Sequence, residues 1–156
     1  MTALIDRLLK RVVVFCLAMM VVVVTWQVLS RYVLGDPSAW TEEVARMLLI
    51  WVGLLGGAYV YREKAHLGLD LLHQKLGPAG QKWLDVIADV ACGAFALTVL
   101  VIGGGSLVQL TWELGQTTAA LGIPMAWVYI VLPLSGLLIV YYSLVSLLTP
   151  PMEKSA

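Results

Sequence analysis

Four long, predominantly apolar stretches constrain the fold of this 156-residue chain more than any other feature. Each is long enough to cross a bilayer as a helix, and none alternates apolar and polar residues as a membrane β-strand would. A composition of 60% hydrophobic against 13% charged residues excludes an ordinary soluble domain. The sequence therefore predicts one all-α integral membrane domain, residues 1–156, with four transmembrane helices. They span about 8–29, 44–61, 83–110 and 123–148.

The first stretch has one feature of a secretory signal, because Lys10 and Arg11 precede an apolar run that begins at Val12. A cleaved signal would end soon afterwards at a small-x-small triplet. The run instead continues through Trp26 and Leu29 without one. We therefore expect this stretch to be a retained first span.

Lysine and arginine are distributed unevenly between the two sides that four spans would define. Because cytoplasmic loops carry an excess of these residues, the larger set marks the cytoplasmic side. Of the ten, eight fall on the side of the N-terminus and two, Arg31 and Arg46, fall on the other. The eight are Arg7, Lys10, Arg11, Arg62, Lys64, Lys75, Lys82 and Lys154. We therefore predict that both termini are cytoplasmic.

The cytoplasmic connection between the second and third spans has a helical pattern of its own. Leucines recur at roughly helical spacing from Leu67 to Leu76, and polar residues fill the other face before Gly77 and Pro78 break the run. At about ten residues the pattern is too short to span, so we expect a short amphipathic helix lying in the membrane interface. Pro78 is then placed to open the third span in its first turn.

The start of the second span carries charged residues just after Trp40, on the predicted outer face. Glu42 and Glu43 lie in the first helical turn, where the positive end of the helix dipole favours acids. Arg46 follows Glu42 by four residues, which is the favourable order for an ion pair on one helix face. Two interpretations stay open: a solvated helix start at the lipid headgroups, or a surface that binds a partner.

Ionisable residues inside the spans are few. Asp85 and Asp89 lie four residues apart on one face of the third helix, near its predicted cytoplasmic end. Acids at such positions are candidates for function. We expect them to pair with Lys82, Arg62 or Lys64, or with a partner chain, rather than to move protons or ions.

Small residues mark places where helices can approach closely. Gly53 and Gly57 form a small-xxx-small pair in the second span. Beside them, Trp51 could face lipid, fill the core or contact a partner. A run of three glycines from Gly103 either kinks the third span or provides a second close contact. Pro133 removes a helical hydrogen bond from the fourth span, which should bend there.

The sequence lacks the motifs of an enzyme, including a nucleophile elbow, a phosphate loop and a zinc-protease motif. Both histidines, His66 and His73, fall in the cytoplasmic connection, so the spans offer no axial ligands for a haem. Cys16 and Cys92 lie inside apolar runs and are interpreted as buried small residues. We therefore expect no enzymatic activity, no cofactor, no bound metal and no nucleic-acid partner.

The spans also have almost none of the midplane polar groups from which transporters build a solute site, and no internal repeat is visible. A chain of this kind cannot easily enclose a polar solute by itself. The residues alone therefore favour a subunit that supports another membrane protein.

Two blocks of residues resemble one family. The first holds W-T-E-E-x-A-R from Trp40 to Arg46, then Trp51, Gly57-Ala58 and Arg62, and A-H-x-G-x-D from Ala65 to Asp70. The second holds L-G-I-P-M from Leu121 to Met125, followed by Trp127, Tyr129 and Pro133. In this order along nearly the whole chain, the blocks resemble the small membrane subunit, DctQ-like, of tripartite ATP-independent periplasmic (TRAP) transporters.

The resemblance implies a sodium-coupled uptake system for organic acids, such as dicarboxylates, keto acids or sugar acids like sialic acid. The partners would be a large multispanning membrane subunit, which moves the substrate in an elevator manner, and a periplasmic substrate-binding protein. This chain would be a small permease subunit in the bacterial inner membrane and a fixed scaffold for the large one. The alternative is a membrane anchor or assembly subunit of another inner-membrane complex, such as a respiratory enzyme.

The resemblance also implies roles for residues within the second span and at its two ends. The outer group, which would bind a partner or serve the structure, is Trp40, Glu42, Glu43 and Arg46. The helix-packing group is Trp51, Gly53 and Gly57. The inner group, which would hold the cytoplasmic end and contact phospholipid headgroups at its basic residues, is Arg62, Lys64, His66 and Asp70. Asp85 and Asp89 stay intramembrane acids without an assigned role.

Overall fold

The computed structural model describes residues 2–36, 38–63 and 77–148, and the described part is helical almost throughout. Its α-helices are α1 (Thr2–Leu29), α2 (Ala39–Arg62), α4 (Pro78–Phe95), α5 (Gly104–Glu113), α6 (Met125–Tyr129) and α7 (Val131–Leu148). Two wider π-helical segments, Ser30–Leu34 and Ala96–Gly103, continue α1 and join α4 to α5. The all-α prediction is therefore confirmed. The predicted interfacial helix falls on residues 64–76 and lies outside the described residues.

Four helical stretches are long and apolar enough to cross a membrane, which confirms the predicted number. They are Leu4–Leu34, Ala39–Arg62, Gly80–Glu113 and Met125–Leu148. The first is longer than predicted, because the helix continues past Leu29 to Leu34. Gly35 ends it, at a φ of 70° that a residue with a side chain seldom adopts.

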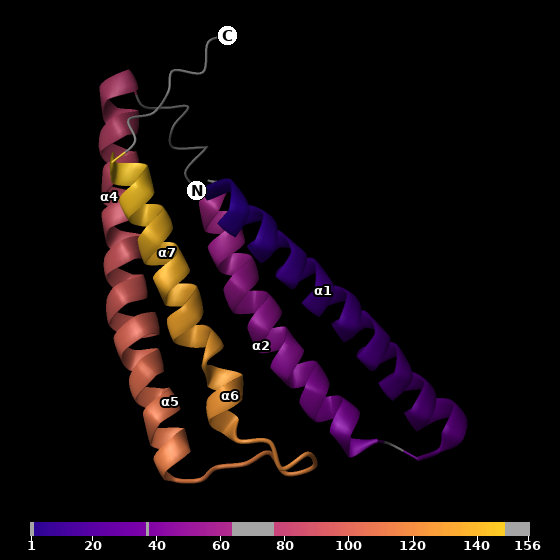
Figure 1. Cartoon of the computed structure of the whole chain (residues 1–156). Helices are drawn as coiled ribbons and strands as arrows, with labels where there is room; N and C mark the ends of the chain where they lie inside the picture. The colour runs from indigo at the N-terminus through magenta and orange to yellow at the C-terminus, as the bar shows by residue number, and fades with distance from the viewer. Residues whose placement is uncertain (1, 37, 64–76, 149–156) are drawn as a thin grey trace.

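The helices lie side by side in one layer, in the order α1, α2, α7 and then α4 with α5 (Figure 1). Each helix contacts its neighbours in this order, so α7, the last in sequence, lies between α2 and the third span. We call the end of the layer that holds residues 35–46 and 114–124 the outer end, after the orientation predicted above, and the opposite end the inner end.

The layer buries few side chains. In α1 the buried residues Leu9, Cys16 and Val23 recur every seven positions, which forms a single narrow stripe along the helix. Within the apolar 18-residue stretch of each span, at most 28% of the residues are buried in the structure. Most of the apolar surface is therefore left for lipid or for another protein.

Glycines permit a close contact within the layer, between α7 and the third span. A Cβ atom on Gly136 would lie 2.7 Å from Cβ of Leu100, and one on Gly104 would lie 2.7 Å from Cβ of Leu132. We expected the glycine run that starts at Gly103 either to kink the third span or to provide a close contact. Gly104 provides the close contact. Pro78 opens α4 at its first turn, as predicted.

The fourth span is interrupted at Ile130, between α6 and α7. Pro133 has no N–H to donate to the carbonyl of Tyr129, so the regular hydrogen-bond ladder cannot pass this point. The predicted disturbance is confirmed, but the helix breaks one turn before the proline rather than at it. Pro124 precedes the first residue of α6 and closes the outer loop.

Candidate functional site: the ends and exposed face of the second helix

Glu42 and Arg46 form the predicted pair on the outer turns of α2. Nη2 of Arg46 lies 3.1 Å from Oε1 of Glu42, and their side chains are 69% and 56% exposed. Exposed pairs of this kind stabilise a protein little. Trp40, just before them, is 47% exposed. These side chains are therefore available at the outer surface.

Glu43 makes a contact inside the chain that the sequence analysis missed. Its Oε1 accepts a hydrogen bond of 2.6 Å from the amide of Ala120, and its Oε2 accepts one of 3.0 Å from the amide of Leu121. The acid thus joins the start of α2 to the loop between α5 and α6. More than 75 residues separate the partners along the chain, and no local pattern could have indicated the contact.

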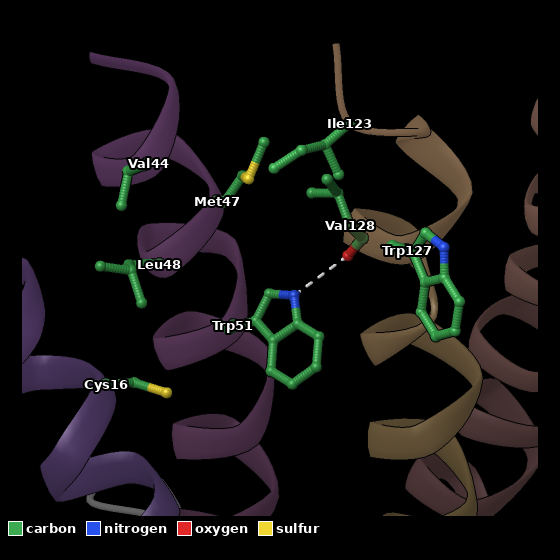
Figure 2. Close-up of a pocket in the computed structure, with 8 residues that line it drawn as sticks. All are labelled: Cys16, Val44, Met47, Leu48, Trp51, Ile123, Trp127 and Val128. Atoms are coloured by element: carbon green, nitrogen blue, oxygen red, sulfur yellow. Dashed lines mark hydrogen bonds between the residues drawn. The ribbon is translucent and has the colours of Figure 1, made fainter. Parts of the chain in front are cut away.

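Trp51, whose role was open, faces the interrupted fourth span. Its Nε1 donates a hydrogen bond of 3.2 Å to the carbonyl of Val128, close to the break at Ile130 (Figure 2). A backbone carbonyl without a partner is costly at membrane depth. Trp51 therefore supplies a donor where the helix of the fourth span is discontinuous.

An apolar pocket of about 260 Å³ lies on the same side of α2. Figure 2 shows that α2 residues form one wall, with α1 on one side and the start of the fourth span on the other. The lining residues are Cys16, Val44, Met47, Leu48, Trp51, Ile123, Trp127 and Val128. All of these side chains are apolar apart from the indole N–H groups, so the pocket offers no charge to a ligand.

Gly53 and Gly57 lie on a different face of α2, and that face is open. A Cβ atom on either glycine would meet no atom within 4 Å. Leu49 and Val60, at helical spacing on the same face, are 60% and 47% exposed. In the described part of the chain, no helix uses the close approach that these glycines permit.

At the inner end, Arg62 is held by α1 and α7. Its Nε lies 3.3 Å from Oδ2 of Asp6, and its guanidinium lies 5.8 Å from the centre of the Tyr142 ring. The Tyr142 hydroxyl donates a hydrogen bond of 2.8 Å to Oδ1 of the same aspartate. The sequence analysis did not single out Asp6 or Tyr142, which come from opposite ends of the sequence.

Asp89 is bound by a tyrosine, a partner that the sequence analysis did not name. Its Oδ1 accepts a hydrogen bond of 2.8 Å from the hydroxyl of Tyr61, and its backbone carbonyl accepts one of 2.7 Å from Ser143. Of the basic partners expected for the two acids, Arg62 contacts Asp6 instead, and Lys64 lies outside the described residues. At the inner end, one tyrosine–aspartate bond links α2 to α4 and the other links α7 to α1.

The structure says less about the remaining residues of the predicted groups. Asp85 is half-buried one turn before Asp89 on α4. Lys64, His66 and Asp70 lie outside the described residues. Among the residues that the structure does describe, no three His, Cys, Asp or Glu side chains gather where a metal ion could bind.

Comparison with known proteins gives one consistent match. The family model described as "Tripartite ATP-independent periplasmic transporters, DctQ component" matches residues 20–150. The chain is 27% identical to the sialic acid TRAP transporter small permease protein SiaQ of Vibrio cholerae, over 90% of this chain and 79% of that protein. It is 29% identical to a putative TRAP transporter small permease protein of Haemophilus influenzae, over 86% of this chain and 82% of the relative.

A third relative places a similar segment inside a longer polypeptide. The isethionate TRAP transporter permease protein DctMQ of Oleidesulfovibrio alaskensis is 31% identical over 72% of this chain, and the match covers 19% of that protein. The relatives are named as transporter permease proteins. The family match, which covers most of the chain, agrees with the four apolar helices. This multi-pass inner-membrane protein therefore belongs to the DctQ component family of tripartite ATP-independent periplasmic transporters.

Proposed function

We propose that this chain is the small permease subunit of a sodium-coupled TRAP transporter and a fixed scaffold for a large elevator-type subunit. The observation that carries the proposal is the open layer, in which four spans lie side by side (Figure 1). Even in the most buried span, only 28% of the residues of its apolar stretch are buried. An open layer of this kind leaves apolar helix surface for a second membrane protein. Its described spans bury few side chains, which does not favour a closed interior for a solute.

The exposed face of α2 is the proposed contact with the large subunit. Gly53 and Gly57 leave open space beside the helix backbone, where a partner helix could approach closely. Helix association in membranes depends on such packing, because lipid and protein side chains are equally apolar. Trp51 lies on another side of α2, where it already binds Val128, and we assign it to internal packing.

The charged ends of α2 are proposed to fix the scaffold at the two membrane surfaces. At the outer end, Trp40, Glu42 and Arg46 are exposed and available to the large subunit or to a periplasmic substrate-binding protein. At the inner end, Arg62 is proposed to contact phospholipid headgroups together with Lys64, and His66 and Asp70 to hold the cytoplasmic end. Both termini are then cytoplasmic, as the charge distribution predicts.

The transported solute is proposed to be an organic acid, such as a dicarboxylate, a keto acid or a sugar acid. The relatives' names refer to sialic acid, isethionate, C4-dicarboxylates and ectoine. In the described part of this chain, the pocket beside Trp51 is lined almost wholly by apolar atoms, which does not suit an anionic solute. Substrate choice is therefore assigned to the partner proteins.

Co-purification tests the scaffold proposal. The tagged chain is co-expressed with the large permease subunit of the same transporter, extracted in mild detergent and purified through its tag. We expect one stable complex that contains both chains. Recovery of this chain alone, with the large subunit found only in the unbound fraction, would contradict the proposal.

A further inference from the structure

The segment from residue 115 to residue 129, here called the outer strap, has a conformation of its own. It comprises the loop after α5 and the short helix α6. Within it, the amide of Thr118 donates to the carbonyl of Ile123 at 2.9 Å, and the amide of Gly122 donates to the carbonyl of Thr118 at 3.0 Å. Gly115, at a φ of 59°, begins the strap, and the break at Ile130 ends it. The strap is therefore a folded unit between two points where the helices stop.

Two polar contacts join the outer strap to one side of α2. Glu43 binds the successive amides of Ala120 and Leu121, and Trp51 binds the carbonyl of Val128. Eight residues separate Glu43 from Trp51, which is about two helical turns and puts both on the same side of the helix. The apolar pocket lies along this side of α2, with Met47 between the two polar residues (Figure 2).

Each contact gives backbone polar groups of the strap a hydrogen-bond partner. Two successive amides that point the same way form a site for an anion, and a carboxylate can accept from both at once. A glutamine has one side-chain oxygen to offer, and its NH₂ group cannot accept. The carbonyl of Val128 lies beside the interrupted ladder of the fourth span, where the indole N–H acts as its donor.

We propose that Glu43 and Trp51 together form a latch that holds the outer strap against α2, with the break at Ile130 as the hinge. Release of the latch frees the strap and uncovers the pocket, while the long helices stay folded. Glu43 is thus a positioning residue for the outer surface and not a direct contact to a partner. This inference concerns the chain by itself and does not depend on the proposed transport function.

Hydrogen–deuterium exchange of the purified chain in lipid nanodiscs tests the latch. Glu43→Gln should raise the exchange rates of the Ala120 and Leu121 amides by roughly tenfold, the effect of losing a hydrogen bond to a charged group. Glu42→Gln is the matched control, because Glu42 binds Arg46 on its own helix, and it should leave both amides within about twofold of the wild-type rate. Trp51→Phe should also raise exchange across the strap, since the two contacts hold one unit.

The peptides of α4 and α7 serve as internal references. Equal strap exchange in Glu43→Gln and Glu42→Gln would overturn the latch. Faster exchange throughout α4 and α7 as well would also overturn it, because the contact would then support the whole fold and not a hinged strap. Glu43→Asp keeps the charge but is one methylene shorter, so it should give the same local increase if the glutamine variant does not fold.

Discussion

Gly136 and Gly57 have opposite surroundings, so the same substitution should have opposite effects on the lone chain. A Cβ atom on Gly136 would lie 2.7 Å from Cβ of Leu100, 2.9 Å from Cγ2 of Val101 and 3.1 Å from the carbonyl oxygen of Ala96. The third neighbour is backbone, which cannot move aside as a side-chain tip can. Gly136→Ala must therefore push α7 away from the third span.

The magnitude follows from two opposing effects. Overpacking of a close contact costs about 1–3 kcal/mol, while alanine is about 1 kcal/mol better than glycine inside a helix. A Cβ atom on Gly136 would make two contacts shorter than 3 Å, so we expect an overpacking cost in the upper part of its range. After the gain from alanine is subtracted, the free energy of unfolding should fall by about 1–2 kcal/mol. At Gly57 nothing lies within 4 Å, so Gly57→Ala should gain up to about 1 kcal/mol.

The assay is equilibrium unfolding of each purified variant by SDS in mixed micelles, followed by co-purification with the large permease subunit. Gly136→Ala should unfold at lower SDS than the wild type. Gly57→Ala should unfold at the same or higher SDS, yet yield less complex, because the added methyl group occupies the proposed partner face. A destabilised Gly57→Ala chain would refute the open-face assignment, and an undiminished complex yield would place the large subunit elsewhere.

Three further predictions concern single contacts, each measured by the same unfolding titration. Trp51→Phe removes the donor to Val128 and should cost about 1 kcal/mol, within the range for hydrogen bonds in membrane proteins. Trp127→Phe is the control and should be neutral, because Trp127 is 58% exposed. Tyr61→Phe leaves the carboxylate of Asp89 without its phenol and should cost about 1–3 kcal/mol, and a neutral result would remove this bond from the inner-end network. Arg62→Gln breaks a partly exposed pair with Asp6 and should cost at most about 1 kcal/mol, so a larger loss would show that Arg62 supports more of the fold than its contacts indicate.

The helices could be predicted from sequence because each depends on local features. A bilayer requires a long apolar run to be helical, and Pro78 fits the first turn of a helix. The Glu42–Arg46 pair follows from spacing on one helix. Even the helix break has a local cause in Pro133, although its position at Ile130 depends on the whole turn before the proline.

The contacts between helices could not be predicted in the same way. Glu43 binds amides at residues 120 and 121, Tyr61 binds Asp89, and Asp6 binds Tyr142. These pairs depend on which helix faces lie against each other, and in a membrane no hydrophobic pattern distinguishes a buried face from one that faces lipid. For the same reason the order of the spans in the layer, with α7 between α2 and α4, is not visible in the sequence.

We propose that this chain supports transport by a partner and does not transport by itself. The most direct test is sodium-driven uptake of a radiolabelled organic acid into proteoliposomes, with the periplasmic binding protein supplied outside. We predict uptake when this chain and the large subunit are reconstituted together, and none when this chain is reconstituted alone. Uptake by this chain alone, or full uptake by the large subunit without it, would contradict the scaffold account.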